Sequence, residues 1–264
     1  MTDVVDMAAA PATGQSGFRA AKGLGYLRFL KNLHAQKLFD VYLEIGTEMG
    51  RSLALSRSRS VAVDPFFRLN DTAMGVKPGL HLFQCGSDEF FATEFLSRND
   101  LAIGFGFLDG MHLFEYLLRD LMNSERNARP GSVLALHDCC PFGPDMLTRD
   151  LEMIPAGAWT GDVWKLIPIL QKYRPDLTLT VLDCSPTGLV LISALDPAST
   201  VLADHYDEIV ADWTDVTLQD YGVANFFDLF DYVSAWDEVT NGFPLFAAAA
   251  MKDGTALNPV KVTT

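Results

Sequence analysis

The feature that most limits how this chain can fold is a regular alternation of short apolar runs with longer amphipathic ones. Amphipathic stretches at residues 51–58, 88–96, 112–125 and 163–173 predict helices. Such strand–helix alternation predicts a parallel sheet with helices on both faces, an α/β fold. The runs that predict strands are residues 39–46, 60–64, 80–85, 101–109, 130–138, 177–183 and 188–193.

The last two apolar runs are joined only by the short turn CSPTG, so they predict a hairpin that adds one antiparallel strand at or near the sheet edge. Residues 200–264 are acid-rich and aromatic and show no strand alternation. We expect them to be a helical C-terminal extension of the same domain, which spans residues 17–199. Residues 1–16 are expected to be a flexible tail.

Composition excludes several classes of function. The net charge is −14 and the pI about 4.6, which disfavours nucleic-acid binding because nucleic-acid binders carry a basic surface. No run of 18 uncharged apolar residues predicts a membrane span, and the acidic start of the chain does not resemble a signal peptide. The four cysteines are scattered, and the pair Cys139–Cys140 lacks zinc-site spacing. A cytoplasmic protein with reduced thiols is therefore predicted.

Small and polar residues gather where five consecutive predicted strands end. In an open parallel sheet, ligands bind outside the carboxyl ends of the strands, so these residues are the candidate site. In chain order they are Glu44 and Gly46, Asp64, Gly86 and Ser87, Asp109 and His112, and His137 and Asp138.

The stretch LEIGTEMG indicates what kind of ligand this site takes. Gly46 and Gly50 allow a backbone turn to approach a ligand closely before a helix. The dinucleotide fingerprint GxGxxG would need a glycine where Glu48 stands, so a nicotinamide or flavin coenzyme is disfavoured. Asp64, after the second strand, suits a ribose diol. The pattern therefore predicts a ligand with a ribose and without a pyrophosphate.

These motifs resemble those of class I S-adenosylmethionine-dependent methyltransferases. The likeness covers about residues 39–193 and is greatest to small-molecule O-methyltransferases, of the catechol and macrolide-sugar types. It implies a Rossmann-like, doubly wound, mostly parallel seven-stranded sheet whose last strand is antiparallel. It also implies the cofactor residues: Gly46 with Gly50 beside the methionine part, Glu44 shaping that turn, Asp64 on the ribose, Gly86 and Ser87 along the adenine, and Asp109 facing the cofactor.

The stretches FLDGMH and LALHD resemble the metal and base motifs of the same enzymes. Asp109 and Asp138 end neighbouring strands, so their carboxylates could converge on one Mg²⁺, which prefers oxygen ligands. His112 follows Asp109 by three residues and is the predicted general base. The chain departs from the family at Cys139, where many metal-dependent members have Asn, because a thiol is a poor ligand for Mg²⁺.

Each of these residues also has a structural reading. Glu44 and Gly46 could serve the turn alone, Asp64 could cap the turn that follows it, and Asp109 could cap a helix. We expect His137 to be a buried histidine with a backbone partner and Trp164 to pack a helix onto the sheet. The aromatic residues at positions 226–236 are expected to pack, or else to form a contact between two copies of the chain.

The sequence thus predicts an S-adenosylmethionine-dependent methyltransferase that acts on a hydroxyl of a small molecule with the help of Mg²⁺. A sugar or a polyhydroxylated natural product is the expected acceptor. One alternative is a metal-independent methyltransferase in which Asp109 and Asp138 only orient the substrate. Another is a non-catalytic protein of the same fold that binds a partner through its aromatic C-terminal part.

Overall fold

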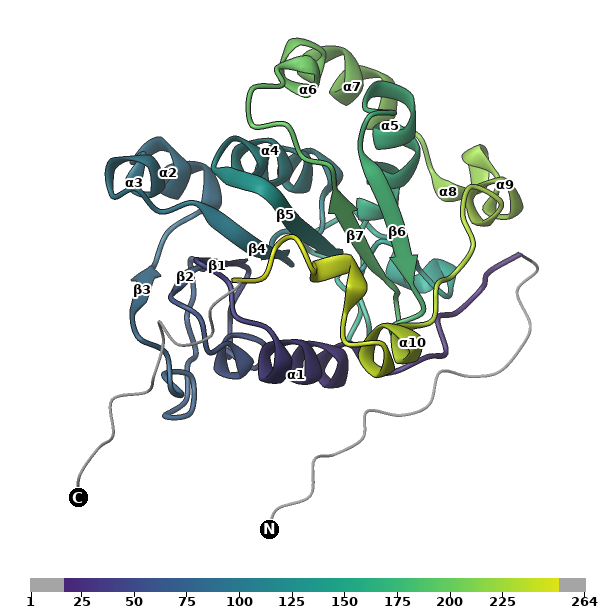
Figure 1. Ribbon diagram of the computed structural model, residues 1–264. Coiled ribbons are helices and arrows are strands. Elements are labelled where there is room, and N and C mark those ends of the chain that lie inside the picture. Colours follow the sequence, from purple (N-terminus) through teal and green to yellow (C-terminus); the bar gives the residue numbers. More distant parts are fainter. Residues whose placement is uncertain (1–16, 252–264) are drawn as a thin grey trace.

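The computed structural model of the protein describes residues 17–251. A seven-stranded sheet forms its centre (Figure 1). The strands lie in the order β3-β2-β1-β4-β5-β7-β6. Strand β7 runs antiparallel to both neighbours, and the remaining pairs are parallel. The predicted fold class, including the antiparallel last strand, is therefore confirmed. The strands are β1 (Tyr42–Ile45), β2 (Ser60–Val63), β3 (Leu80–Phe83), β4 (Ile103–Leu108), β5 (Ala128–His137), β6 (Thr178–Leu182) and β7 (Leu189–Ser193).

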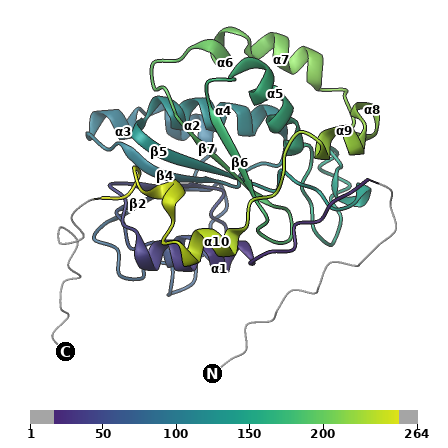
Figure 2. The same cartoon turned by 45° about the vertical axis from the view of Figure 1, so that its right-hand side comes forward.

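Helices cover both faces of this sheet. Figures 1 and 2 show α1 and α10 on one face, and α2 to α7 on the other. The longer helices are α1 (Tyr26–Gln36), α4 (Phe114–Arg126), α5 (Leu166–Tyr173) and α7 (Tyr206–Trp213). The shorter ones are α2 (Ser87–Ala92), α3 (Phe95–Arg98), α6 (Val201–Asp204), α8 (Leu218–Tyr221), α9 (Val223–Phe227) and α10 (Ala235–Thr240).

Two hydrophobic cores result, one on each face of the sheet. Along β1 the side chains alternate: Leu43 and Ile45 join the core under α4 and α5, whereas Tyr42 joins the core under α1 and α10. This period of two follows from strand geometry. Burying each such side chain contributes about 1.5–3 kcal/mol, so the register of the central strands is strongly fixed. The ends of β1, β4 and β5 are thereby held at one edge of the sheet.

The helices predicted at residues 51–58 and 88–96 differ most in the structure. Residues 51–58 form only the short 3₁₀ turn Leu53–Leu55, because the serines that follow bond outside a helix. Ser58 Oγ, for example, accepts a hydrogen bond from the Phe39 amide at 2.8 Å. The helix predicted at residues 88–96 is divided into α2 and α3 by Glu94, whose φ is 53°.

Helix α1 was not predicted, although its sequence YLRFLKNLHAQ has apolar residues at helical spacing. Its buried face consists of Phe29, Leu30, Leu33 and His34. The stretch predicted as one helix at residues 163–173 is a 3₁₀ turn, Val163–Lys165, followed by α5 from Leu166; Pro168 lies in the first turn of α5, where proline is tolerated.

Helices α6 to α10 follow the last strand. Phe226 and Phe227 are fully buried, and the Phe226 ring lies 5.5 Å from that of Trp164, which is itself 2% exposed. These aromatic residues pack in the core, as expected for Trp164. The predicted flexible tail at residues 1–16, and residues 252–264 of the predicted helical extension, lie outside the described part of the chain. Between residues 17 and 251, no helix has the length and apolar character needed to cross a bilayer.

Candidate active site

Gly46 follows β1 and lies against the ends of β2 and β4. Its φ is +83°, and its amide donates to the Val63 carbonyl at 2.9 Å. A Cβ atom at this position would lie 1.9 Å from the carbonyl oxygen of Asp109, the residue after β4. A side chain is therefore excluded both by the backbone conformation and by the neighbouring strand end. The predicted need for a glycine here has a local structural cause.

Asp64 holds the loop that follows β1. Its Oδ2 accepts a hydrogen bond from the Glu48 amide at 2.7 Å, and its Oδ1 accepts from the Phe66 amide at 2.6 Å. The second bond is the turn cap that was considered from the sequence. Each carboxylate oxygen has two lone pairs, so this residue retains the capacity to accept from ribose hydroxyls. Asp64 is 8% exposed.

Asp109, His137 and Asp138 converge at the ends of β4 and β5. One potential ligand atom of each lies within 4.8 Å of the others. His137 Nδ1 is 3.0 Å from Asp109 Oδ1 and 3.4 Å from Asp138 Oδ2. The hydroxyl of Thr187 donates to Asp138 Oδ1 at 2.6 Å. The prediction that the two aspartates lie together is thus met by the geometry.

His112 faces the same two carboxylates. Its Nε2 lies 3.3 Å from Asp109 Oδ1 and 3.4 Å from Asp138 Oδ2. Its Nδ1 lies 2.7 Å from the carbonyl oxygen of Trp159, and the two rings are 4.9 Å apart. Because a carbonyl only accepts, Nδ1 carries the proton and Nε2 is the nitrogen that can exchange one with the site.

The histidines and aspartates of this cluster shift one another's pKa values. Burial lowers the pKa of His112, but the hydrogen bond with Asp109 and the charges of Asp138 and Asp109 outweigh it and raise that pKa. Burial likewise opposes the charged form of His137, yet the charges of the two aspartates raise its pKa well above the ordinary value. The pKa of Asp109 is lowered by both histidines against the effect of burial. Without a bound cation, imidazolium protons can thus neutralise the carboxylates.

His137 differs from the expectation of a backbone partner. Its ring lies 4.2 Å from that of Tyr26 and 5.7 Å from that of Phe107. Among the described residues, its Nε2 is buried and has no hydrogen-bond partner. Sequence reasoning did not single out Tyr26, although the apolar spacing of α1 was a usable signal for the helix that carries it.

Glu44 lies beneath the turn and is fully buried. Tyr42 donates a hydrogen bond of 2.5 Å to its Oε2. Burial raises the pKa of Glu44 to about 7, although the bond from Tyr42 lowers it. Glu44 is therefore a buried acid within β1, and its role in shaping a cofactor turn stays a prediction.

Gly86 and Ser87 stand at the start of α2, after the edge strand β3. A Cβ atom at Gly86 would meet nothing within 4 Å, so the fold does not require a glycine there. The Ser87 hydroxyl bonds to the buried Asp120 and lowers its pKa against a larger effect of burial, which raises it to about 7. Gly50, with a φ of +72°, would bring a Cβ atom 2.8 Å from the Leu69 side chain.

Cys139 does not take the place of a metal ligand. Its side chain is fully buried in the core under α4 and α5, and its Sγ lies 3.4 Å from the His137 carbonyl oxygen. The third donor next to the two aspartates is therefore an imidazole, from His137. Two carboxylates suit Mg²⁺, and the imidazole also suits first-row divalent ions. The donor set fits a divalent cation.

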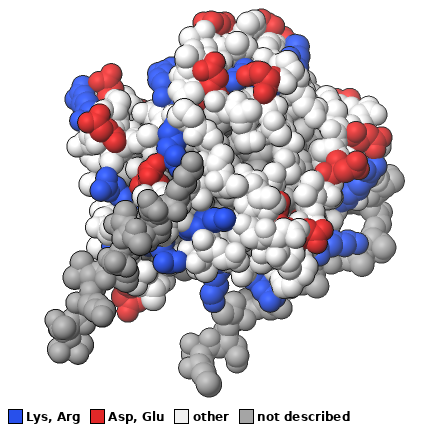
Figure 3. Space-filling model, in the orientation of Figure 1, with Lys and Arg blue, Asp and Glu red and all other residues white. Residues whose placement is uncertain are grey.

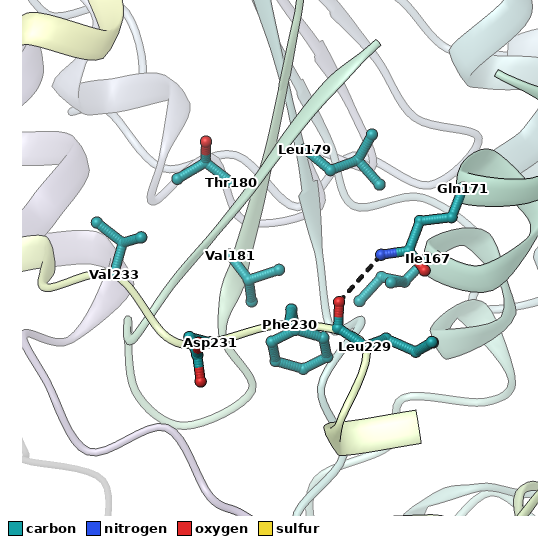
Figure 4. Close-up of a pocket in the computed structure, with 9 residues that line it drawn as sticks. All are labelled: Ile167, Gln171, Leu179, Thr180, Val181, Leu229, Phe230, Asp231 and Val233. Atoms are coloured by element: carbon teal, nitrogen blue, oxygen red, sulfur yellow. Dashed lines mark hydrogen bonds between the residues drawn. The ribbon is translucent and has the colours of Figure 1, made fainter. Parts of the chain in front are cut away.

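Within residues 17–251, one cavity lies apart from this site. A cavity of about 200 Å³ lies between α5, β6 and residues 229–233, where Gln171 donates to the Leu229 carbonyl at 3.1 Å (Figure 4). None of the residues that line it belongs to the cluster described above. On the face drawn in Figure 3, Lys and Arg side chains stand in separate groups, with acidic or uncharged surface between them.

The sheet order, with its reversed last strand, is the seven-stranded Rossmann-like arrangement that the sequence motifs implied. No family model and no curated protein matches this chain. Solved structures similar to it include the O-methyltransferase TomG from Streptomyces achromogenes in complex with SAM, at 16% identity and a TM-score of 0.45, over 64% of this chain and 79% of that one.

Two further similar structures contain S-adenosylhomocysteine. The MycE methyltransferase of the mycinamycin biosynthetic pathway, with Mg and mycinamycin VI, is 13% identical at a TM-score of 0.44, over 66% of this chain and 49% of that one. An O-methyltransferase from Bacillus cereus is 15% identical at a TM-score of 0.41, over 63% of this chain and 79% of that one. All three likenesses have TM-scores below 0.5 and identities of 16% or less.

Proposed function

We propose that this protein is an S-adenosylmethionine-dependent methyltransferase that moves a methyl group to a hydroxyl of a small molecule, assisted by a divalent cation. The observation that carries the proposal is the convergence of Asp109, His137 and Asp138 with His112 at strand ends that also hold the Gly46 turn. Few structural needs explain two histidines and two aspartates gathered at this edge of the sheet.

The residues of the chain divide the work of the reaction. The turn at Gly46 and the carboxylate of Asp64 would bind the cofactor, which supplies an activated methyl group when present. Asp109, His137 and Asp138 would hold the cation, which lowers the pKa of a bound hydroxyl. His112 Nε2 would accept the hydroxyl proton, while Trp159 keeps Nδ1 occupied. The protein thereby orients the acceptor and removes its proton.

A metal-independent methyltransferase is the second candidate, and a specific observation favours it. His112 Nε2 and His137 Nδ1 both face carboxylate oxygens, so two imidazolium protons can occupy the position of a cation. In that case the aspartates would orient the substrate and tune His112. A titration of Mg²⁺ and Mn²⁺ by calorimetry separates the two: micromolar binding supports the metal-assisted reaction, and no binding supports the rival.

The acceptor, the partners and the location of the protein are also proposed. A sugar or a polyhydroxylated natural product remains the proposed acceptor, and neither nucleic acid nor a membrane is a proposed partner. Assembly through the C-terminal helices, reduced cysteines and a cytoplasmic location also remain predictions. The direct test is calorimetry with S-adenosylhomocysteine against NAD, followed by turnover assays on hydroxylated acceptors. Binding of NAD alone would refute the proposal.

A further inference from the structure

The loop after β5 closes on itself next to His112. Trp159 Nε1 donates to the Thr148 carbonyl at 2.8 Å, and the amides of Thr160 and Gly161 both donate to the Met146 carbonyl, at 2.9 and 3.0 Å. The far side of this closed loop, from Thr148 to Trp159, carries exposed apolar side chains such as Met153, which is 69% exposed. The two ends of the loop, in contrast, are joined by these three hydrogen bonds.

The C-terminal end of the loop, at Asp162, binds the backbone at His112 and two residues after it. The Asp162 amide donates to the His112 carbonyl at 3.1 Å, and Asp162 Oδ1 accepts from the Phe114 amide at 2.9 Å. Helix α4 has no side-chain cap of its own at Leu113, so Asp162 acts as its cap from 48 residues further along the chain. Gly161 permits this approach, since a Cβ atom there would lie 1.7 Å from the His112 carbonyl oxygen.

Arg149 connects this end of the loop to α4. Its guanidinium pairs with the Asp162 carboxylate and also with Glu115, at 2.7 Å from Nη2 to Oε1 and 3.1 Å from Nη1 to Oε2. Lys165, 1% exposed, supplies a second cation 2.7 Å from Asp162 Oδ2. Bidentate contacts of this kind fix geometry as well as energy. One arginine thus connects the loop, the start of α4 and, through Asp162, the backbone of His112.

We propose that Arg149, acting with Asp162, is a positioning residue that holds the His112 imidazole with Nδ1 on the Trp159 carbonyl and Nε2 toward Asp109 and Asp138. The inference rests on the proposed role of His112 as the base. This clamp, formed by Arg149 and Asp162, restricts the rotation of the His112 ring and keeps a proton on Nδ1. Both decide whether Nε2 can reach a substrate proton. Arg149 need not touch substrate or cofactor.

The chain contains a matched control at the other end of the same helix. Arg174 makes an equally bidentate pair with Glu125, at 2.7 and 2.9 Å, and is 1% exposed. The Arg149 side chain is 30% exposed. Arg174→Met should therefore destabilise the fold at least as much as Arg149→Met, without touching the loop that holds His112.

The test compares Arg149→Met, Arg149→Lys and Arg174→Met. Long-range ¹H–¹⁵N spectra of the histidine rings, assigned through His112→Gln, should show a fixed, hydrogen-bonded Nδ1–H of His112 in the wild type and in Arg174→Met, whichever state Nε2 has. In Arg149→Met this signature should be lost, and kcat should fall about 10- to 100-fold while KM changes less than about twofold. Arg149→Lys should recover part of both. If Arg149→Met fails to fold, Glu115→Gln, which weakens the same contact, should show the smaller version of each effect.

An unchanged His112 signature and kcat in Arg149→Met would overturn the clamp, as would equal losses in Arg174→Met. The spectra need neither cofactor nor acceptor. A lost signature together with no binding of S-adenosylhomocysteine to the wild type would therefore refute the proposed function and leave the clamp standing.

Discussion

Replacing Gly46 by alanine tests the packing that joins the cofactor turn to the metal cluster. The added Cβ atom would lie 1.9 Å from the Asp109 carbonyl oxygen, and the φ of +83° is unfavourable for alanine. The backbone conformation costs about 1–2 kcal/mol and the overpacking about 1–3 kcal/mol, so we expect a loss of about 2–5 kcal/mol of unfolding free energy. The backbone shift should also displace Asp109 and abolish the binding of S-adenosylhomocysteine.

Gly86→Ala is the matched control for this substitution. Gly86 has a φ of −65°, which alanine adopts freely, and a Cβ atom there meets nothing within 4 Å. Its unfolding free energy should stay within about 1 kcal/mol of the wild type, since the loss of a glycine cap and the stiffer unfolded chain nearly cancel. Urea unfolding with an unchanged m-value measures both variants. A Gly46→Ala protein as stable as Gly86→Ala, with intact ligand binding, would refute the reasoning.

Three further outcomes follow from the site. His112→Gln should lower kcat by about 100-fold or more while the affinity for S-adenosylhomocysteine, measured by calorimetry, stays nearly unchanged; equal losses of both would remove the base role. Excess EDTA should abolish turnover and Mg²⁺ or Mn²⁺ should restore it, whereas full turnover in EDTA would support the metal-independent rival. The pKa of Asp120 is raised to about 7 from 3.8, because the folded protein buries it, so folding binds a proton between these values and stability falls as pH rises through them. Asp120→Asn should therefore gain stability relative to the wild type by up to about 4 kcal/mol between pH 4 and pH 8, as measured by urea unfolding; an equal difference at both pH values would contradict this.

The strand-end residues show how far sequence reasoning reaches. Strand ends of a parallel sheet meet at one edge, so Asp109 and Asp138 could be brought together from their positions alone. His112 followed from its distance of three residues from Asp109. Helix α1 was equally readable from its spacing, and overlooking it hid Tyr26, whose ring packs against His137.

The surroundings of His112 could not be predicted in the same way. Trp159 and Asp162 lie on a loop that has no strand or helix periodicity. The bond of Trp159 to His112 Nδ1 spans 47 residues, and the bond of Asp162 to the Phe114 amide spans 48. The partner of Ser87 was hidden for a similar reason, since Asp120 lies on a helix that the sheet order brings near. Contacts of this range depend on tertiary packing, which a local pattern does not encode.

The most direct test of the central claim is a crystal structure of the protein with S-adenosylhomocysteine and Mn²⁺. The account predicts the nucleoside beside Asp64, the amino-acid part above the turn at Gly46, and a cation bound by Asp109, His137 and Asp138. Electron density for the ligand in another place, or none at these strand ends at saturating ligand, would contradict it.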